Sequence, residues 1–141
     1  MTMRSATPLV DLMVASALLV AGGGIALAGG QRATFIDGIY AMEGRCESLV
    51  ALDAGGPRTV ETVPETLTAE GFKTWEGGCD FAGIEEEVEG RVFVATMTCT
   101  DGADEWKETD TFTVDPADRS ITVAVDGESS RYVYCGSGKG N

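Results

Sequence analysis

Four cysteines offer the main chemical potential of this 141-residue chain, which contains no histidine. Cys46, Cys79, Cys99 and Cys135 include no C-x-x-C pair, whereas structural zinc sites usually contain closely spaced pairs. The absence of histidine excludes a Ser-His-Asp triad and a Cys-His dyad. The spacing therefore predicts two disulfides, which leave no thiol free to act as a nucleophile, and no cofactor or metal is expected.

The turn chemistry favours one of the three possible cysteine pairings. Strand-like runs at residues 81–88 and 91–98 meet at Glu89-Gly90, where glycine permits the positive φ of a tight hairpin. Folding the chain about Glu89 places Cys79 opposite Cys99. Opposed Cα atoms in an antiparallel ladder lie about 4.5 to 5.5 Å apart, within disulfide range. This arrangement predicts a Cys79–Cys99 bridge and, by exclusion, a Cys46–Cys135 bridge.

Carboxylates form two clusters along the chain, one before the turn at Gly90 and one after residue 100. Two-carboxylate glycoside hydrolysis needs no histidine, but residues approaching a turn are expected in solvent rather than in a cleft. Calcium is a weak alternative at Asp101 and Asp104, whose spacing matches no EF-hand loop. The clusters comprise Glu85, Glu86, Glu87 and Glu89, and then Asp101, Asp104, Glu105, Glu108 and Asp110.

The charge balance limits the partners of the protein. With 23 acidic and 10 basic residues, the formal net charge is -13. Such a chain repels phosphate backbones and anionic lipid, so nucleic-acid binding and membrane-surface binding are not expected. A cationic protein is the favoured partner class, although the charge also serves solubility alone. The candidate partner-binding residues are Glu85, Glu86, Glu87, Glu89, Trp75 and Trp106, although aromatic residues in a small β domain more often serve core and edge packing.

The second half of the chain alternates polar and apolar residues with the period of two expected for half-buried strands. Strands are predicted over 91–100, 106–114, 119–125 and 129–135, with turns at Asp101-Gly102, at 115–118 and at Asp126-Gly127. The first half is less regular, with a helix within residues 40–54 and short strands at 59–63 and 67–75. We expect a mainly β (α+β) fold, an antiparallel meander forming a curved sheet or small open barrel, with one short N-terminal helix and two disulfides.

The N-terminal residues 1–28 have the features of a secretory signal peptide. Arg4 precedes a mostly apolar stretch, and Ala26-Leu27-Ala28 is a small-x-small cleavage motif. A retained membrane anchor is the alternative, but the glycines at 22–24 favour cleavage. The remaining chain is predicted to be one disulfide-bonded domain over 29–135, followed by a flexible tail over 136–141. Periplasmic or secreted localisation follows, since disulfides persist in oxidising compartments.

These features together favour a non-enzymatic exported binding or envelope-associated module that engages a cationic protein. The alternatives are a calcium-stabilised structural protein and a carboxylate-dependent glycan hydrolase. In being small, acidic, disulfide-bonded and β-rich, the chain is similar to small exported inhibitors of bacterial periplasms, some of which bind cationic lysozymes. This similarity carries no site residue over, because Ser130-Arg131-Tyr132 lies in a predicted strand where Tyr132 is needed for packing.

Overall fold

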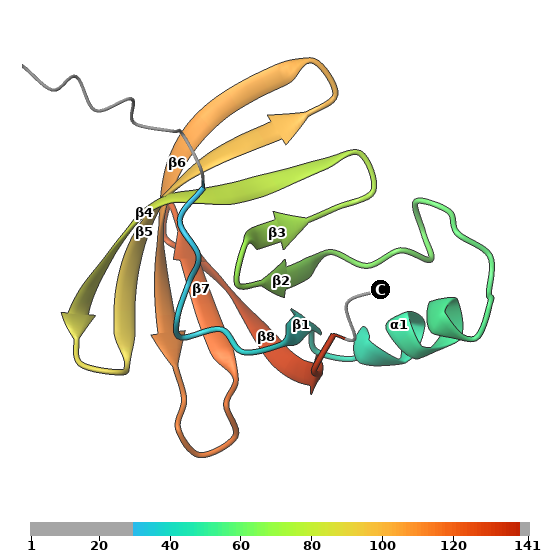
Figure 1. Ribbon diagram of the computed structural model, residues 1–141, viewed down its shortest axis with the longest axis horizontal. Helices are drawn as coiled ribbons and strands as arrows, with labels where there is room; N and C mark the ends of the chain where they lie inside the picture. Colours follow the sequence, from blue (N-terminus) through green and yellow to red (C-terminus); the bar gives the residue numbers. More distant parts are fainter. Residues whose placement is uncertain (1–29, 139–141) are drawn as a thin grey trace, which may run out of the picture.

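Eight strands, each hydrogen-bonded to the next along the chain, close into an antiparallel barrel in the computed structural model, which describes residues 30–138 (Figure 1). The predicted signal peptide and residues 139–141 of the predicted tail lie outside the described residues. Eight strands enclose an interior that side chains fill or that holds one small ligand. The elements are β1 (Ile39–Met42), α1 (Cys46–Asp53), β2 (Thr66–Thr68), β3 (Gly71–Lys73), β4 (Gly77–Val88), β5 (Val92–Asp101), β6 (Asp104–Val114), β7 (Ile121–Val125) and β8 (Glu128–Gly136).

The predicted β-rich meander with one short helix and two disulfides is confirmed. Its ring is closed by β1, which pairs with β2 on one side and with β8 on the other. Tyr40 lies opposite both Leu67 and Tyr134 in these ladders. Closure leaves the barrel without a free sheet edge among the described strands.

The β4–β5 hairpin places Cys79 directly opposite Cys99, as predicted. The chain turns around Gly90, which has a φ of 65°. Two register shifts in β4, between Phe81 and Gly83 and between Glu86 and Val88, add residues on that strand alone. Together the two β-bulges shift the register of β4 against β5, so that Cys79 lies opposite Cys99 at the far end of the hairpin.

The first half differs from the sequence prediction at two places. The helix covers only Cys46–Asp53, because Tyr40 and Ala41 are buried in strand β1. Residues 59–63 form turns rather than a strand. There the hydroxyl of Thr62 accepts a hydrogen bond from Thr59 N and donates one to Pro57 O. These side-chain bonds satisfy backbone groups that would otherwise pair with a neighbouring β-strand. The predicted 67–75 strand is two short strands, β2 and β3.

One end of the barrel is filled by the segment that precedes β1. Its backbone bonds to Phe81 through Gln31 and to Ala69 through Ala33. Phe35 then packs on Phe93, and also contacts the rings of Phe81 and Phe112. Figure 1 shows this blue segment passing β4 on its way to β1. The opposite end has no such covering segment within residues 30–138 and is lined by hairpins.

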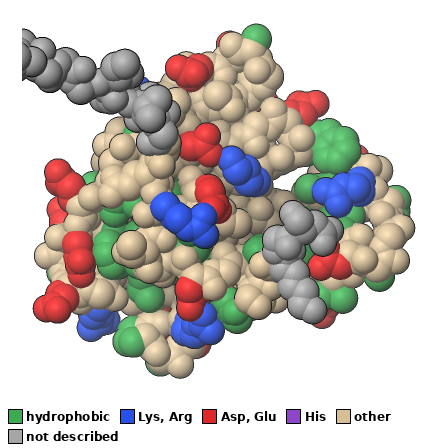
Figure 2. Space-filling view, in the orientation of Figure 1, with side chains coloured by type: hydrophobic (Ala, Val, Ile, Leu, Met, Phe, Trp, Pro, Cys, Tyr) green, Lys and Arg blue, Asp and Glu red, His purple; other side chains and the backbone are tan. Residues whose placement is uncertain are grey.

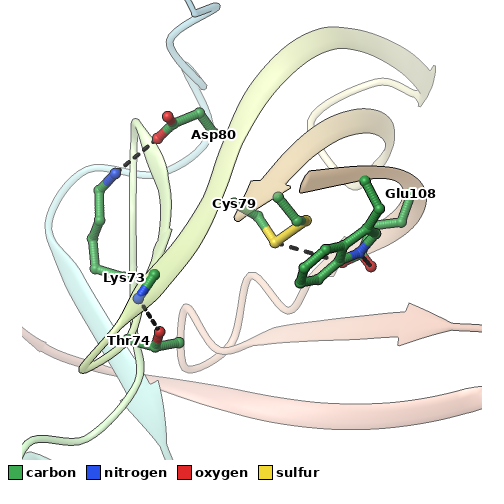
Figure 3. Close-up of a disulfide and its surroundings, with 8 residues drawn as sticks. Lys73, Thr74, Cys79, Asp80 and Glu108 are labelled. Atoms are coloured by element: carbon green, nitrogen blue, oxygen red, sulfur yellow. Dashed lines mark hydrogen bonds and ion pairs between the residues drawn. A yellow bond between two sulfur atoms is a disulfide. The ribbon is translucent and has the colours of Figure 1, made fainter. Parts of the chain in front are cut away.

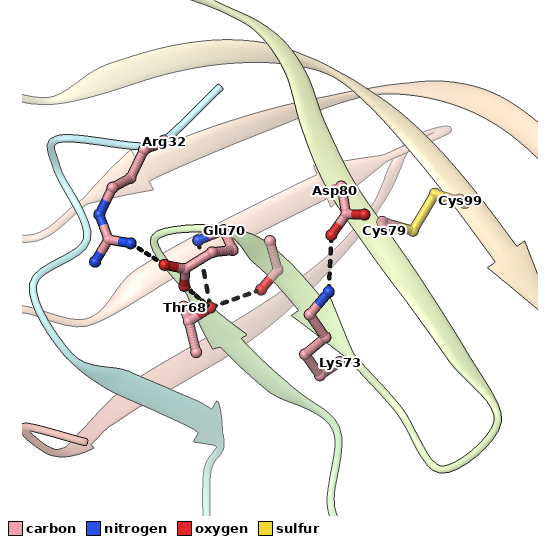
Figure 4. Close-up of polar contacts among 8 residues, drawn as sticks. Arg32, Thr68, Glu70, Lys73, Cys79, Asp80 and Cys99 are labelled. Atoms are coloured by element: carbon pink, nitrogen blue, oxygen red, sulfur yellow. Dashed lines mark hydrogen bonds and ion pairs between the residues drawn. A yellow bond between two sulfur atoms is a disulfide. The ribbon is translucent and has the colours of Figure 1, made fainter. Parts of the chain in front are cut away.

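Basic and acidic side chains pair on the outer surface. Lys73 donates to Asp80 at 2.7 Å across the β3–β4 hairpin, and Arg32 pairs with Glu70 at the β2–β3 turn (Figure 4). The face in Figure 2 accordingly carries red and blue side chains intermixed. No helix within the described part of the chain has the length and apolar character needed to cross a bilayer.

Candidate functional site

A cavity of about 650 Å³ occupies the unfilled end of the barrel. The hairpins β3–β4, β5–β6 and β7–β8 surround it together with the segment before β2. Its volume lies within the range of small-molecule sites in proteins. The lining residues are Val60, Val63, Glu65, Phe72, Thr74, Trp75, Glu76, Gly78, Cys79, Thr100, Asp101, Trp106, Glu108, Asp110, Val123, Val125, Asp126, Glu128, Ser130 and Tyr132.

Strand β6 supplies a carboxylate-rich wall of this cavity. Side chains along a strand alternate between its two faces, so Trp106, Glu108 and Asp110 share the inward face with the fully buried Phe112. Exposure falls along this row, from 43% at Trp106 to 1% at Asp110. The row therefore leads from the solvent-facing rim of the cavity to its base.

Asp110 is a buried carboxyl group at the base of the cavity. Neither of its side-chain oxygens has a hydrogen-bond partner within residues 30–138. Burial, together with the nearby charges of Glu108 and Asp126, raises the pKa of Asp110 to about 7. A buried carboxylate is costly unless it is paired, so an unpartnered one in a cavity indicates a functional group awaiting a positive charge or a donor.

Glu108 lies above Asp110 on the same wall and is held in place by its neighbours. The indole N–H of Trp106 donates to Glu108 Oε2 at 2.9 Å, and Glu108 Oε1 lies 3.7 Å from Cys79 Sγ. Figure 3 shows Glu108 and the Cys79 disulfide facing each other, with Asp80 on the other side of β4 beside Lys73. The Cys79–Cys99 bridge thus forms part of the cavity wall.

A second carboxylate is anchored on the opposite wall by a phenol. The hydroxyl of Tyr132 donates a hydrogen bond to Glu65 Oε1. Burial raises the pKa of Tyr132 well above its ordinary value, and the contact with Glu65 and the charge of Asp110 act in the same direction. Tyr132 therefore remains a neutral donor, and the segment before β2 is fixed to β8.

All the charged side chains that line the cavity are negative. Seven of the lining residues are acidic and none is Lys or Arg. The ion pairs of the described residues involve other carboxylates, so no basic side chain of residues 30–138 neutralises this group. Such a concentration of one sign in a partly desolvated cavity attracts cations. The seven are Glu65, Glu76, Asp101, Glu108, Asp110, Asp126 and Glu128.

The candidate partner-binding residues from the sequence lie at two separate places. Trp75 and Trp106 both line the cavity and remain 45% and 43% exposed at its rim. Glu85, Glu86, Glu87 and Glu89 are exposed at the β4–β5 hairpin, at the end of the barrel that Phe35 fills. The two halves of the predicted set are therefore not brought together.

The weak calcium candidates, Asp101 and Asp104, lie opposite each other at the end of the β5–β6 ladder, but only Asp101 lines the cavity. Asp104 is exposed to solvent. In the part of the chain that the structure describes, the potential ligand atoms that lie within 4.8 Å of one another belong to Cys79, Cys99 and Glu108. The two sulfur atoms are bonded to each other, so this group is not a metal site.

Both predicted disulfides are present, and no cysteine of the chain is free. Cys46–Cys135 links the start of α1 to the end of β8, 89 residues apart. Cys79–Cys99 crosses the β4–β5 hairpin. Two bridges are consistent with an oxidising, extracellular environment.

Sequence analysis missed the inward-facing carboxylates. Glu108 and Asp110 belong to the predicted strand 106–114 but were grouped with an acidic cluster expected in solvent, although the period of two that puts Trp106 and Phe112 on one face puts them there as well. Glu65 and Asp126 carry no such pattern, because they lie in loops, and Glu128 is only the first residue of β8 after the β7–β8 turn. A strand with carboxylates on its apolar face is the sequence signal that indicates this site.

Comparison with family models, with curated proteins and with solved structures finds no match to this chain.

Proposed function

We propose that this protein is an exported, non-enzymatic binding module and that the open end of the barrel receives a cationic partner. The observation that carries the proposal is the lining of the cavity, with seven carboxylates and no Lys or Arg. The net charge of -13 adds a long-range attraction for the same class of partner. The two disulfides and the signal-like residues 1–28 support work outside the cytosol.

The rim of the cavity supports a protein as the source of the positive charge. Trp75, Trp106 and Val60 are large apolar side chains that remain between 43% and 62% exposed around the cavity. Exposed tryptophans beside a charged pocket are typical of binding surfaces, because they bury much area with little loss of side-chain freedom. A basic protein would place a charged side chain in the cavity and apolar side chains against this rim.

Tryptophan fluorescence tests the proposal directly, since the only two tryptophans of the chain both line the cavity. Titration with poly-L-lysine and with a folded basic protein such as lysozyme is expected to change the emission at micromolar concentrations. The effect should weaken steeply as salt rises, because charge attraction supplies much of the association. Poly-L-glutamate should produce no change. Absence of any salt-sensitive complex would refute the proposal.

Two triple variants with the same change in charge locate the interaction. Glu108→Gln, Asp126→Asn and Glu128→Gln together remove three of the seven carboxylates that line the cavity. The matched control, Glu85→Gln, Glu86→Gln and Glu87→Gln, removes three charges from the opposite end of the barrel. Binding should be lost in the first variant and kept in the second. The reverse result would assign the partner to the β4–β5 hairpin.

A second candidate function, carboxylate-dependent glycan hydrolysis, is favoured by one observation. Asp110 is a buried carboxyl group whose pKa is raised to about 7, the property required of a general acid, and it lies beside Glu108 in a cavity. The binding function is favoured over it because neither oxygen of Asp110 has a contact that would orient it for proton transfer. Hydrolysis of glycan substrates that is abolished in Asp110→Asn would replace the binding proposal.

A further inference from the structure

We infer that the cavity holds an organic monocation, an ammonium or guanidinium group on an apolar stem, with its charge directed to Asp110 at the base and with Glu108 and Asp126 adding negative charge higher in the cavity. This inference rests on the proposed function and specifies the chemistry that the site recognises. Its two supports are an unpartnered buried carboxyl group at the base and an aromatic wall above it.

Asp110 is the group to which a bound cation would supply the missing hydrogen-bond donors. Only 1% of its surface is exposed, and both of its side-chain oxygens lack a hydrogen-bond partner within residues 30–138. An ammonium or guanidinium group supplies N–H donors and a positive charge together, which a neutral ligand cannot. Because Asp110 lines the cavity but both of its oxygens are covered, side chains must move for the bound cation to reach them.

The wall of the cavity suits the apolar stem of such a ligand. Phe72, Trp75, Trp106 and Tyr132 contribute aromatic surface, and Val123 and Val125 contribute aliphatic surface. Aromatic faces also attract cations, and this attraction strengthens as water is excluded. The cavity therefore offers an apolar path from the rim to the charged base.

An inorganic ion fits the same site poorly. Calcium takes six to eight oxygen ligands in one compact shell. No three acidic side chains of the described residues each place an oxygen within 4.8 Å of the other two. Carboxylates spread around a cavity of about 650 Å³ suit a cation that carries its own bulk.

Binding of such a cation should depend on pH. The ionisable groups around Asp110 are Glu108 on the same strand, Asp126 in the β7–β8 turn, and Tyr132 on β8. Tyr132 in turn bonds to Glu65. All are acidic or phenolic, so no basic neighbour stabilises the ionised form of Asp110 before the ligand arrives. Below the pKa of about 7, binding releases one proton, and affinity should rise about tenfold per pH unit. Above it the affinity should level off.

Phenethylamine, butylguanidine and the neutral control phenethyl alcohol are the probes for this inference. Fluorescence and calorimetric titrations at pH 8 should detect both cations and not the alcohol. Asp110→Asn should weaken cation binding about tenfold or more, and Glu108→Gln should weaken it less. Glu85→Gln, at the other end of the barrel, should leave it unchanged. Circular dichroism and intact disulfides verify that each variant is folded.

One further titration distinguishes a basic protein from a free small molecule as the source of the cation. A capped peptide whose lysine ammonium group is its only charge is titrated beside phenethylamine. Tighter binding of the peptide assigns the cation to a basic protein, and tighter binding of the amine assigns it to a free small molecule. Either result supports the inferred chemistry.

Three outcomes would overturn the inference. Equal binding of phenethyl alcohol would make the cavity a general apolar site. Unchanged cation binding in Asp110→Asn would place the charge elsewhere. Binding of lysozyme or poly-L-lysine without any binding of the small cations would reject this inference alone and leave the proposed function intact.

Discussion

The ring of Phe35 stacks on the ring of Phe93, with centroids 4.0 Å apart and planes 11° from parallel. Phe35 belongs to the segment before β1, whereas Phe93 begins the inward row of β5. This contact fixes the N-terminal segment across one end of the barrel. The barrel is therefore closed at this end, and the cavity lies at the opposite, open end.

Replacement of Phe35 by Ala tests the contribution of this contact to stability. The change should lower the free energy of unfolding by about 3 kcal/mol, because it removes the stack with Phe93 and the contacts with Phe81 and Phe112. Urea denaturation provides the measurement. Val88→Ala, at a half-exposed position near the same end, should cost less than about 0.5 kcal/mol. Similar values for the two variants would show that Phe35 does not close the core.

Asp110→Asn should stabilise the protein at neutral and alkaline pH. Because the folded state raises the pKa of Asp110 to about 7, it keeps a proton that the unfolded chain has already lost. The free energy of unfolding therefore falls as pH rises from about 4 to about 7, by at most about 1.4 kcal/mol per pH unit, and the Asn variant lacks this fall. Urea denaturation at pH 5, 6, 7 and 8 measures the difference between the two proteins. A difference that does not change with pH would contradict the raised pKa.

Two glycines of β4 should respond oppositely to alanine. A Cβ on Gly77 would lie 1.9 Å from the carbonyl oxygen of Thr100, so strands β4 and β5 would have to separate. Gly77→Ala should therefore lower the free energy of unfolding by more than about 2 kcal/mol. A Cβ on Gly83 meets nothing within 4 Å, and Gly83→Ala should be neutral or stabilising by up to about 1 kcal/mol. Thermal melts that rank the two variants the other way would reject this account of the hairpin.

Removal of the Cys46–Cys135 bridge should release α1 more than the barrel. The helix has eight residues and none of them is buried, so its isolated stability is marginal. Cys46→Ala with Cys135→Ala should speed amide exchange in α1 while β5 amides stay protected. On the chain-entropy model the variant also loses about 4 kcal/mol of stability. Unchanged exchange in α1 would show that other contacts hold the helix.

The sequence was most informative where short-range rules determine the structure. Turn residues at Gly90, Gly102 and Asp126-Gly127, together with the period of two between them, predicted β4 to β8 and the Cys79–Cys99 pair. The bulges in β4 were not predictable, since nothing local distinguishes a residue that is left unpaired in a ladder. Strand β1 was also missed, because its four residues are strand only through pairing with distant β2 and β8.

The site was only partly predictable for a related reason. Trp75 and Trp106 were recognised as binding candidates, but their neighbours in space come from three hairpins and a loop. Long-range pairing brings Glu65, Glu108 and Asp126 to one cavity, and no spacing in the sequence records it. The exposed glutamates before Gly90 form the denser cluster in sequence, yet they lie away from the cavity.

The Cys46–Cys135 bridge makes the segment from α1 to β8 a covalent ring. A protease that cuts one loop within this ring leaves the two pieces bonded, so a nicked molecule migrates as a single species until a reductant is added. Outside the cell, where peptidases are abundant and reductants scarce, a cut in one loop would not by itself separate the barrel into two chains.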